Sequence, residues 1–258
     1  MDKNIPNFPR KKVYWEKQQK DRLCGVHCLN SLVQSPLFDP FQLSDIAINL
    51  DMLEKNLFDP KIEHKASSTN VDDDGNYNIQ VLSEALKKHG TEIVPLKNSE
   101  AVLLLEKNMD SIEALIFNSS THWYAIRRID KIWFNLNSTN ALPGPEIISD
   151  FYLSAYIKGS EQIGYTNFLV KNLPKLLPLD AMIYSNLQPL QKLVSIEEIV
   201  NAKLENNERL RKIEKDKKKG GKIGTNSGEE KKEEEEDKNK FKAFTGKGIQ
   251  MEEKGIII

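Results

Sequence analysis

Residues 121–138 read THWYAIRRIDKIWFNLNS, and this stretch decides the fold. Apolar and polar residues alternate in its two halves, which is typical of half-buried β-strands. About two residues separate the halves, and such a short connection predicts an antiparallel hairpin.

The position of the turn decides which residues of this hairpin face one another. With a turn centred on residues 129–130, His122 lies directly opposite Asn137 on the same side of the sheet. Directly opposed Cβ atoms are ~4.5–5.5 Å apart, which is close enough for a side-chain hydrogen bond. With a turn centred on residues 130–131, His122 opposes Thr139 instead, and the pairing argument weakens. The Asp-Lys pair of that second turn is a poor signal for a two-residue hairpin.

The rest of the chain surrounds the hairpin with helices first and further strands later. This order predicts an α+β fold, with helices packed on a mainly antiparallel sheet. Asn76 or Asn78 can cap the third helix, and Gly90 stands at its C-terminal end. The expected helices cover residues 24–34 and 42–57, a third stretch that ends before Gly90, and residues 145–159. The other expected strands cover residues 91–96, 113–118 and 165–172.

Composition limits the class of protein. The chain has 258 residues, a net charge of −1 and two cysteines, so neither nucleic acid, an anionic membrane nor a disulfide framework is indicated. The first residues lack the apolar core of a secretory signal, and no run of residues is apolar enough for a membrane span. We therefore expect a soluble protein of the cytoplasm, the nucleus or both.

The composition also changes along the chain. We expect an N-terminal extension over residues 1–12, a catalytic domain over 13–185 and a helical extension over 186–217. Residues 218–258 are rich in charge and poor in large apolar groups, which predicts a disordered tail.

Both cysteines stand in the stretch CGVHC, residues 24–28. Cys24 falls where the first helix begins, where the helix dipole and a nearby imidazolium lower a thiol pKa. Cys28 falls one turn later on the apolar stripe, so Cys24 is the candidate nucleophile and Cys28 a packing residue. Zinc would need about four ligands, and with His27 this stretch offers three. A disulfide across one helical turn would be strained. No metal or cofactor is expected.

Four blocks of the sequence, residues 14–34, 72–90, 122–138 and 144–174, resemble successive parts of the Josephin domain. Within that family the likeness is greatest to the ataxin-type deubiquitinases. The resemblance implies a papain-like cysteine peptidase fold that acts on ubiquitin isopeptide bonds.

The resemblance also implies roles for particular residues. Cys24 is the nucleophile, His122 the general base and acid, and Asn137 the residue that orients the imidazole. A glutamine upstream of the cysteine completes the oxyanion hole in this family. Counting back from the cysteine gives Gln19, which we favour, whereas matching the letters EKQ gives Gln18.

Family members hold ubiquitin with surface apolar residues. Ile79 and Gln80 match one such patch and Phe38 matches part of another, whereas His89 stands where the ataxin-type enzyme has a tryptophan. The tail lacks the pattern of ubiquitin-interacting helices.

The tail has a motif of its own. Phe244, Gly246, Gly248 and Met251 form an F-x-G-x-G-x-x-apolar pattern. It resembles the SHP box, by which cofactors bind valosin-containing protein, an AAA segregase. The leading hypothesis is therefore a cysteine-type deubiquitinase that works with this ATPase. The alternative is a weakly active or inactive ubiquitin-binding adaptor.

Overall fold

The computed structural model describes residues 12–20, 22–57, 68–72, 75–119, 121–139, 143–176 and 187–220. Internal contacts divide the chain into two units, residues 1–211 and 212–258, and the description below concerns the first. Of the second unit, the structure describes only the end of a helix. None of the described helices is both long enough and apolar enough to cross a membrane.

A six-stranded sheet forms the centre of the first unit. Its strand order is β2-β7-β3-β4-β5-β6, and each pairing between neighbours is antiparallel. This confirms the mainly antiparallel sheet. The strands are β2 (Glu92–Pro95), β3 (Ala114–Asn118), β4 (Trp123–Ile129), β5 (Ile132–Asn135), β6 (Glu146–Ile148) and β7 (Thr166–Lys171).

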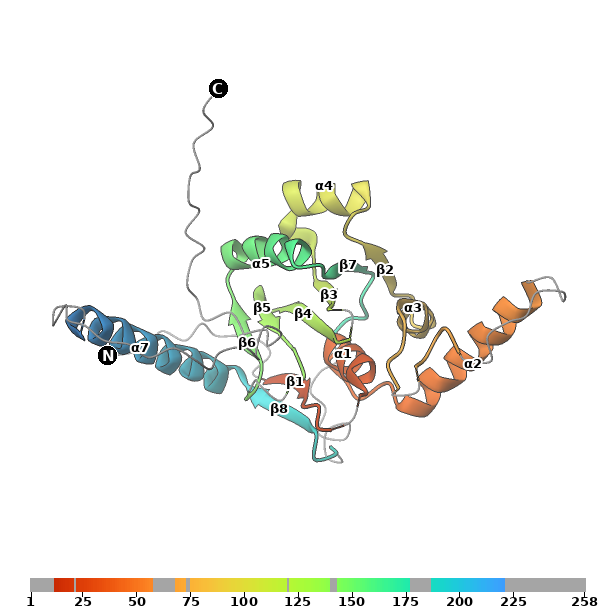
Figure 1. Ribbon diagram of the computed structural model, residues 1–258, viewed down its shortest axis with the longest axis horizontal. Coiled ribbons are helices and arrows are strands. Elements are labelled where there is room, and N and C mark those ends of the chain that lie inside the picture. Colours follow the sequence, from red (N-terminus) through yellow and green to blue (C-terminus); the bar gives the residue numbers. More distant parts are fainter. Residues whose placement is uncertain are drawn as a thin grey trace, which may run out of the picture. The chain divides into compact units, whose positions relative to one another are not determined.

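Helices cover both faces of this sheet (Figure 1). Side chains alternate across a strand, so Ala114 and Ile116 of β3 join one core, whereas Leu115 and Phe117 join the other. The first core is shared with α1 (Cys24–Val33), α2 (Pro40–Leu57) and α3 (Ile79–Lys87). The second is shared with α4 (Ser99–Lys107), the short 3₁₀ turn η1 (Met109–Ser111) and α5 (Asp150–Gln162). The predicted α+β class is confirmed.

A second, two-stranded sheet joins the two ends of the unit. In it β1 (Lys12–Glu16) pairs antiparallel with β8 (Gln191–Ser195), and α7 (Ile196–Gly220) follows directly. Val13 and Trp15 of β1 share a core with Ile196 and Ile199 of α7 and with residues of β5. We expected a helical extension over residues 186–217, but β8 occupies part of its start and the helix begins at Ile196; neither strand was predicted.

The central hairpin turns one residue later than we expected. Ile129 pairs with Ile132, so Asp130 and Lys131 form the turn, and the turn centred on residues 129–130 is wrong. Both turn residues have positive φ, 47° and 68°. A two-residue turn of this kind has the backbone twist that antiparallel strands need. The pairing of buried strand residues therefore outweighs the weak turn signal of Asp-Lys.

The start of helix α5 also differs from the sequence prediction. Residues 146–148 belong to the edge strand β6, and α5 begins at Asp150 with the Ser149 side chain as its N-cap. Asn78, one of the two predicted caps, accepts hydrogen bonds from the backbone N–H groups of Gln80 and Val81 at the start of α3. Helix α4 was not predicted.

Candidate active site

Cys24 is the first residue of α1, as the sequence predicted. Within the described residues no side chain caps this helix, and its first turn holds no acidic residue. The positive end of the helix dipole therefore acts on the thiol itself. The side chain is 1% exposed. Its Sγ lies 3.9 Å from Oδ1 of Asn76 and 4.0 Å from the backbone oxygen of Thr121.

Cys28 has a different environment one turn further along α1. It is buried in the core between α1 and the sheet. Burial raises the pKa of the Cys28 thiol well above its ordinary value, and the neighbouring Cys24 raises it further. Cys28 is therefore a poor thiolate, which suits a packing residue.

Thr121, whose carbonyl oxygen lies beside the Cys24 thiol, immediately precedes His122 in the chain. The Nε2 atom of His122 lies 2.7 Å from Oδ1 of Asn137. The same Oδ1 accepts the backbone N–H of Thr139 at 3.0 Å, which fixes it as an acceptor. Nε2 of His122 is thus the donor, and Nδ1 is the basic nitrogen of the neutral ring.

The His122–Asn137 hydrogen bond forms even though the hairpin register differs from the expected one. The observed register, extended beyond the end of β5, places Thr139 rather than Asn137 opposite His122. The difference is two residues along one strand, and side chains two residues apart lie on the same face. Asn137 is therefore a diagonal neighbour of His122, within reach of its ring.

The surroundings of His122 keep its ring neutral. Burial lowers the pKa of His122, the hydrogen bond with Asn137 partly offsets this effect, and the positive charge of His27 lowers it further. The ring also stacks on Tyr124, with centroids 5.9 Å apart. An unprotonated imidazole at neutral pH can accept a proton from a thiol.

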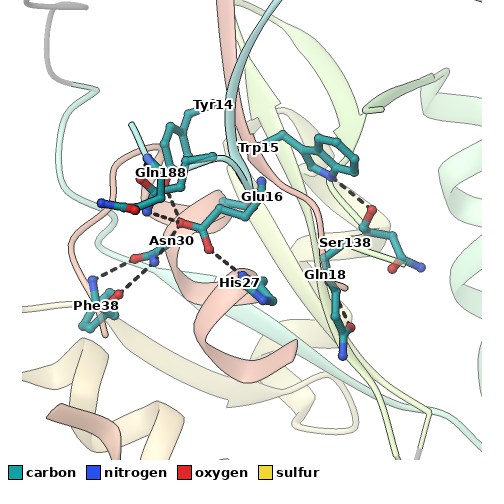
Figure 2. Close-up of polar contacts among 12 residues, drawn as sticks. Tyr14, Trp15, Glu16, Gln18, His27, Asn30, Phe38, Ser138 and Gln188 are labelled. Carbon is teal, nitrogen blue, oxygen red and sulfur yellow. Dashed lines mark hydrogen bonds and ion pairs between the residues drawn. The ribbon is translucent and has the colours of Figure 1, made fainter. Parts of the chain in front are cut away.

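The two candidate glutamines differ in position. Gln18 is half-buried, and its backbone N–H donates to the Ser138 carbonyl at 2.8 Å. The Ser138 hydroxyl lies 3.5 Å from Oε1 of Gln18 (Figure 2). Ser138 directly follows Asn137, so Gln18 is beside the segment that holds the imidazole. Gln19 is exposed.

Sequence reasoning missed the contribution of β1 to the site. The indole N–H of Trp15 donates to the Asn137 carbonyl at 3.0 Å, and the Asn137 backbone N–H donates to Oδ1 of Asn135 at 3.2 Å. Asn137 is thereby fixed through its backbone as well as its side chain. No alternation of apolar and polar residues marks this strand in the sequence, since Val13, Tyr14, Trp15 and Glu16 are all buried.

The expected ubiquitin-binding residues lie in different environments. Ile79 and Gln80 line an open, largely apolar groove of about 490 Å³, together with Leu53 and Leu57 of α2. Phe38, in contrast, is 7% exposed and belongs to the core.

The burial of Phe38 has two causes in the chain around it. The Asn30 side chain accepts the backbone N–H of Phe38 at 2.7 Å and donates to the Phe38 carbonyl at 2.9 Å. The ring meets His89 edge-on, with centroids 5.5 Å apart. The nearby Phe41 side chain, by comparison, is exposed.

Other sequence predictions fall outside the described residues or concern small features. The tail motif at residues 244–251 lies outside the described part of the chain. Before α3, Gly75 has a φ of 88°, and the Asp72 side chain accepts the Asn76 backbone N–H at 2.8 Å, which forms a turn into the helix. Among the described residues, no group of three or more His, Cys, Asp or Glu could hold a metal ion.

The structure thus places the Cys24 thiol beside the carbonyl of Thr121, next to the His122 ring that is bonded to Asn137. A thiol at a helix N-terminus, beside a histidine held by an amide, is suited to attack an acyl carbon. Such an arrangement is suited to thiol acyl-transfer chemistry.

Comparison with known proteins agrees with this geometry. A family model described as Josephin matches residues 19–171, which is more than half of the chain. Human ataxin-3 is 40% identical over 167 residues, which make up 62% of this chain and 45% of that protein. The human ataxin-3-like protein is 40% identical over 169 residues, 62% of this chain and 46% of that protein. An Arabidopsis thaliana ataxin-3 homolog is 32% identical over 180 residues, 66% of this chain and 63% of that protein.

The chain thus spans about half the length of the curated relatives that it matches. The match to the family model nevertheless includes α1 with both cysteines and the whole central sheet. By this match, and as its sequence blocks predicted, the chain belongs to the Josephin family.

Proposed function

We propose that this chain is a thiol-dependent deubiquitinase that hydrolyses the isopeptide bond between the ubiquitin C-terminus and a lysine. The observation that carries the proposal is that the Cys24 thiol of a Josephin chain lies next to the segment that holds His122. The Cys24 thiol lies within 4.0 Å of the Thr121 carbonyl, and the next residue, His122, is bonded to Asn137.

The first step acylates Cys24. His122 takes the thiol proton, and the thiolate attacks the carbonyl carbon of the terminal glycine of ubiquitin. The C–N bond then breaks, His122 gives its proton to the departing lysine amine, and a thioester remains.

The second step hydrolyses this thioester. Water loses a proton to His122 and attacks the acyl carbon, and the C–S bond breaks. The departing Cys24 thiolate takes the proton back from His122, and the ubiquitin carboxylic acid loses its own proton to solvent and leaves as the carboxylate. In both steps the tetrahedral oxyanion needs donors. The backbone N–H of Cys24 at the start of α1 is one, and the Gln18 side-chain amide is the other. Gln18 suits this role better than Gln19 because it lies beside Ser138, next to Asn137.

We propose that the groove between α2 and α3 holds ubiquitin. Ile79 and Gln80 line it, and α2 adds exposed apolar side chains such as Met52 and Leu57. Apolar side chains that stay exposed in a folded domain are typical of a protein-binding surface. Phe38 can contribute only by supporting its neighbours, because its own ring is buried.

We also propose that the chain cooperates with valosin-containing protein, in the cytoplasm or the nucleus. Support comes from the sequence pattern at residues 244–251, in which Phe244 and Met251 offer two apolar anchors. The intervening glycines allow a peptide backbone to lie close along a partner surface.

The alternative is a ubiquitin-binding adaptor with little or no activity. One observation favours it: the Cys24 side chain is 1% exposed, whereas an attacking thiol must meet a substrate carbonyl. An adaptor would still use the groove lined by Ile79.

A ubiquitin bearing a C-terminal electrophile separates the two functions. The proposed enzyme forms a covalent adduct that is lost in Cys24→Ala and kept in Cys28→Ala, as mass spectrometry of the intact protein would measure. Binding of ubiquitin without any adduct would establish the adaptor instead.

Paired substitutions test the oxyanion donor. Loss of one such donor costs about 3–4 kcal/mol in the barrier, so Gln18→Ala should slow turnover of a ubiquitin substrate by 10²–10³-fold, roughly. Gln19→Ala is the matched control and should leave turnover within about twofold. The reverse result would assign the role to Gln19.

Pull-down with purified valosin-containing protein tests the tail. Capture should depend on Phe244 and be lost in Phe244→Ala, whereas adduct formation with the ubiquitin electrophile should not change. Undiminished capture of Phe244→Ala would remove this part of the proposal.

A further inference from the structure

A buried polar cluster joins β1 to α1, the helix that begins with Cys24 (Figure 2). The mechanism above does not use this cluster. Its centre is Glu16 of β1, which is 2% exposed. One carboxylate oxygen, Oε2, lies 2.6 Å from Nδ1 of His27, which is itself 5% exposed. The other oxygen, Oε1, accepts from Asn30 at 3.0 Å, from Gln191 at 3.2 Å and from the Tyr14 hydroxyl.

These contacts define the charge of Glu16. All the groups that bond its carboxylate can donate, so the carboxylate is an acceptor at every position and is suited to be ionised. A buried carboxylate is costly unless a cation accompanies it. The ring of His27 forms the ion pair with it when protonated. The cluster therefore favours an imidazolium at His27.

Helix geometry connects His27 to the nucleophile. Cys24 and His27 are three residues apart in α1, and residues at that spacing lie on the same side of a helix. A positive charge on His27 would also act on the base, since His27 is one of the groups that lower the pKa of His122. An imidazolium at position 27 thus acts on both reacting groups, although it contacts no substrate.

We propose that Glu16 is a positioning residue that acts through His27: its buried carboxylate holds an imidazolium one helical turn from Cys24, and this fixed charge favours the Cys24 thiolate. The proposal deepens the proposed function, on which its catalytic meaning rests. The same charge keeps His122 neutral and ready to accept a proton. Electrostatic support of the thiolate is thereby divided between the helix dipole and His27.

Other ionisable groups also surround α1. Helix α1 itself carries Cys24 and Cys28, and β1 carries Lys12, Tyr14 and Glu16. His122 precedes β4, which carries Arg127 and Arg128, and α3 carries Glu84 and Lys87. Glu84 and Lys87 pair with each other at the surface, and Arg128 pairs with Asp110. Arg127 donates to the Leu32 carbonyl near the end of α1, away from Cys24.

The pH dependence of Cys24 alkylation by iodoacetamide tests the proposal, in the full chain with Cys28→Ala as background. Glu16→Gln keeps the shape of the side chain and removes its charge, so His27 loses its proton at lower pH. The pH at the midpoint of the Cys24 alkylation profile should then rise by about one unit. Glu100→Gln is the control, because Glu100 of α4 pairs with Lys171 and α4 lies on the other face of the sheet from α1, so its alkylation midpoint should equal that of the background.

A second substitution separates this role from general support of the fold. His27→Gln should raise the midpoint by a similar amount, and the double variant should raise it no further, because both changes remove one charge. Additive shifts, or no shift in Glu16→Gln, would overturn the proposal.

A measurement on the unsubstituted protein covers the case in which a variant fails to fold. In ¹⁵N-histidine-labelled protein, both ring nitrogens of His27 should carry protons at pH 7.5, well above the ordinary histidine pKa of about 6.5. A neutral His27 ring at that pH would contradict the proposal.

None of these measurements uses ubiquitin. If the ubiquitin electrophile forms no adduct while the alkylation shift is present, the proposed function fails and the role of Glu16 stands. If an adduct forms and the shift is absent, the function stands and the role of Glu16 is overturned.

Discussion

The protonation of His122 illustrates how single residues control this site. Burial outweighs the hydrogen bond with Asn137, so the pKa of His122 lies below its ordinary value. In the window between the lowered pKa and about 6.5, the unfolded chain binds a proton that the folded chain does not. The contribution of this ring to the free energy of unfolding is therefore fully present above that window, and it is lost as the pH falls through the window.

Two measurements test this direction of the pH dependence. In Cys24→Ala, which removes coupling to the thiol, the His122 ring should titrate below pH 6.5 by NMR. The unfolding free energy of Cys24→Ala should also fall from pH 7 to pH 5.5 more steeply than that of a Cys24→Ala/His122→Gln variant. Equal slopes in the two proteins would show that His122 titrates normally.

Most residues of the candidate site were predictable from the sequence. Cys24 was placed at a helix start by the apolar stripe that follows it, and His122 and Asn137 were placed on one face by strand periodicity. The face was right despite the wrong turn, because a two-residue change in partner preserves it. The choice between Gln18 and Gln19 depended on the path of the chain before α1, which no local pattern describes.

At the scale of elements, α5 is joined to the sheet by a pair of tyrosines close to the site. The hydroxyls of Tyr124 on β4 and Tyr156 on α5 lie 2.7 Å apart, and the Tyr124 ring also stacks on His122. Burial, more than any neighbouring group, raises the pKa of Tyr124 well above its ordinary range and that of Tyr156 to about 12. Both hydroxyls are therefore neutral at working pH.

This pair predicts a non-additive effect on stability. Tyr124→Phe or Tyr156→Phe leaves the partner hydroxyl without its hydrogen bond, which costs about 1–2 kcal/mol. The double variant removes both polar groups and should cost less than the sum of the two single changes. Urea denaturation of the four proteins measures the coupling, and strict additivity would mean that the hydroxyls do not interact in solution.

Helices and strands were predicted where their pattern of apolar residues was long and lay within one stretch of the chain. The central strands and α1 to α3 were predicted, whereas β6 was included in a helix because its three residues are too few to show a period of two. Strands β1 and β8 were missed for another reason: each has five residues, and each is stabilised by the other from the opposite end of the unit. Pairing over such a distance in the chain leaves no mark within a short window of sequence.

For the whole molecule, the β1–β8 pair means that the segment beyond the family match belongs to the folded unit. The match ends at residue 171, yet Ile196 and Ile199 are buried against β1 and β5. Gln191 also bonds Glu16, behind the nucleophile helix. A functional unit defined by the family match alone would therefore lack part of its own core.

Two truncations test this conclusion. A chain that ends after residue 186 loses β8 and the buried side chains of α7, and burial of two isoleucines alone is worth about 3 kcal/mol. Its unfolding free energy, measured by urea denaturation, should fall by at least this amount, roughly. A chain that ends after residue 220 keeps every described contact and should match the full chain. Equal stability of both truncations would show that the two-stranded sheet contributes nothing.

The joining of β1 to β8 also has a consequence during synthesis. A ribosome releases β1 and α1 early, but the strand that pairs with β1 leaves the exit tunnel only after more than 170 further residues have been translated. Until then Trp15 has no completed sheet from which to support Asn137. The nascent polypeptide would therefore carry the Cys24 thiol in an unfinished site, and the proposed hydrolysis would begin only when translation has passed β8.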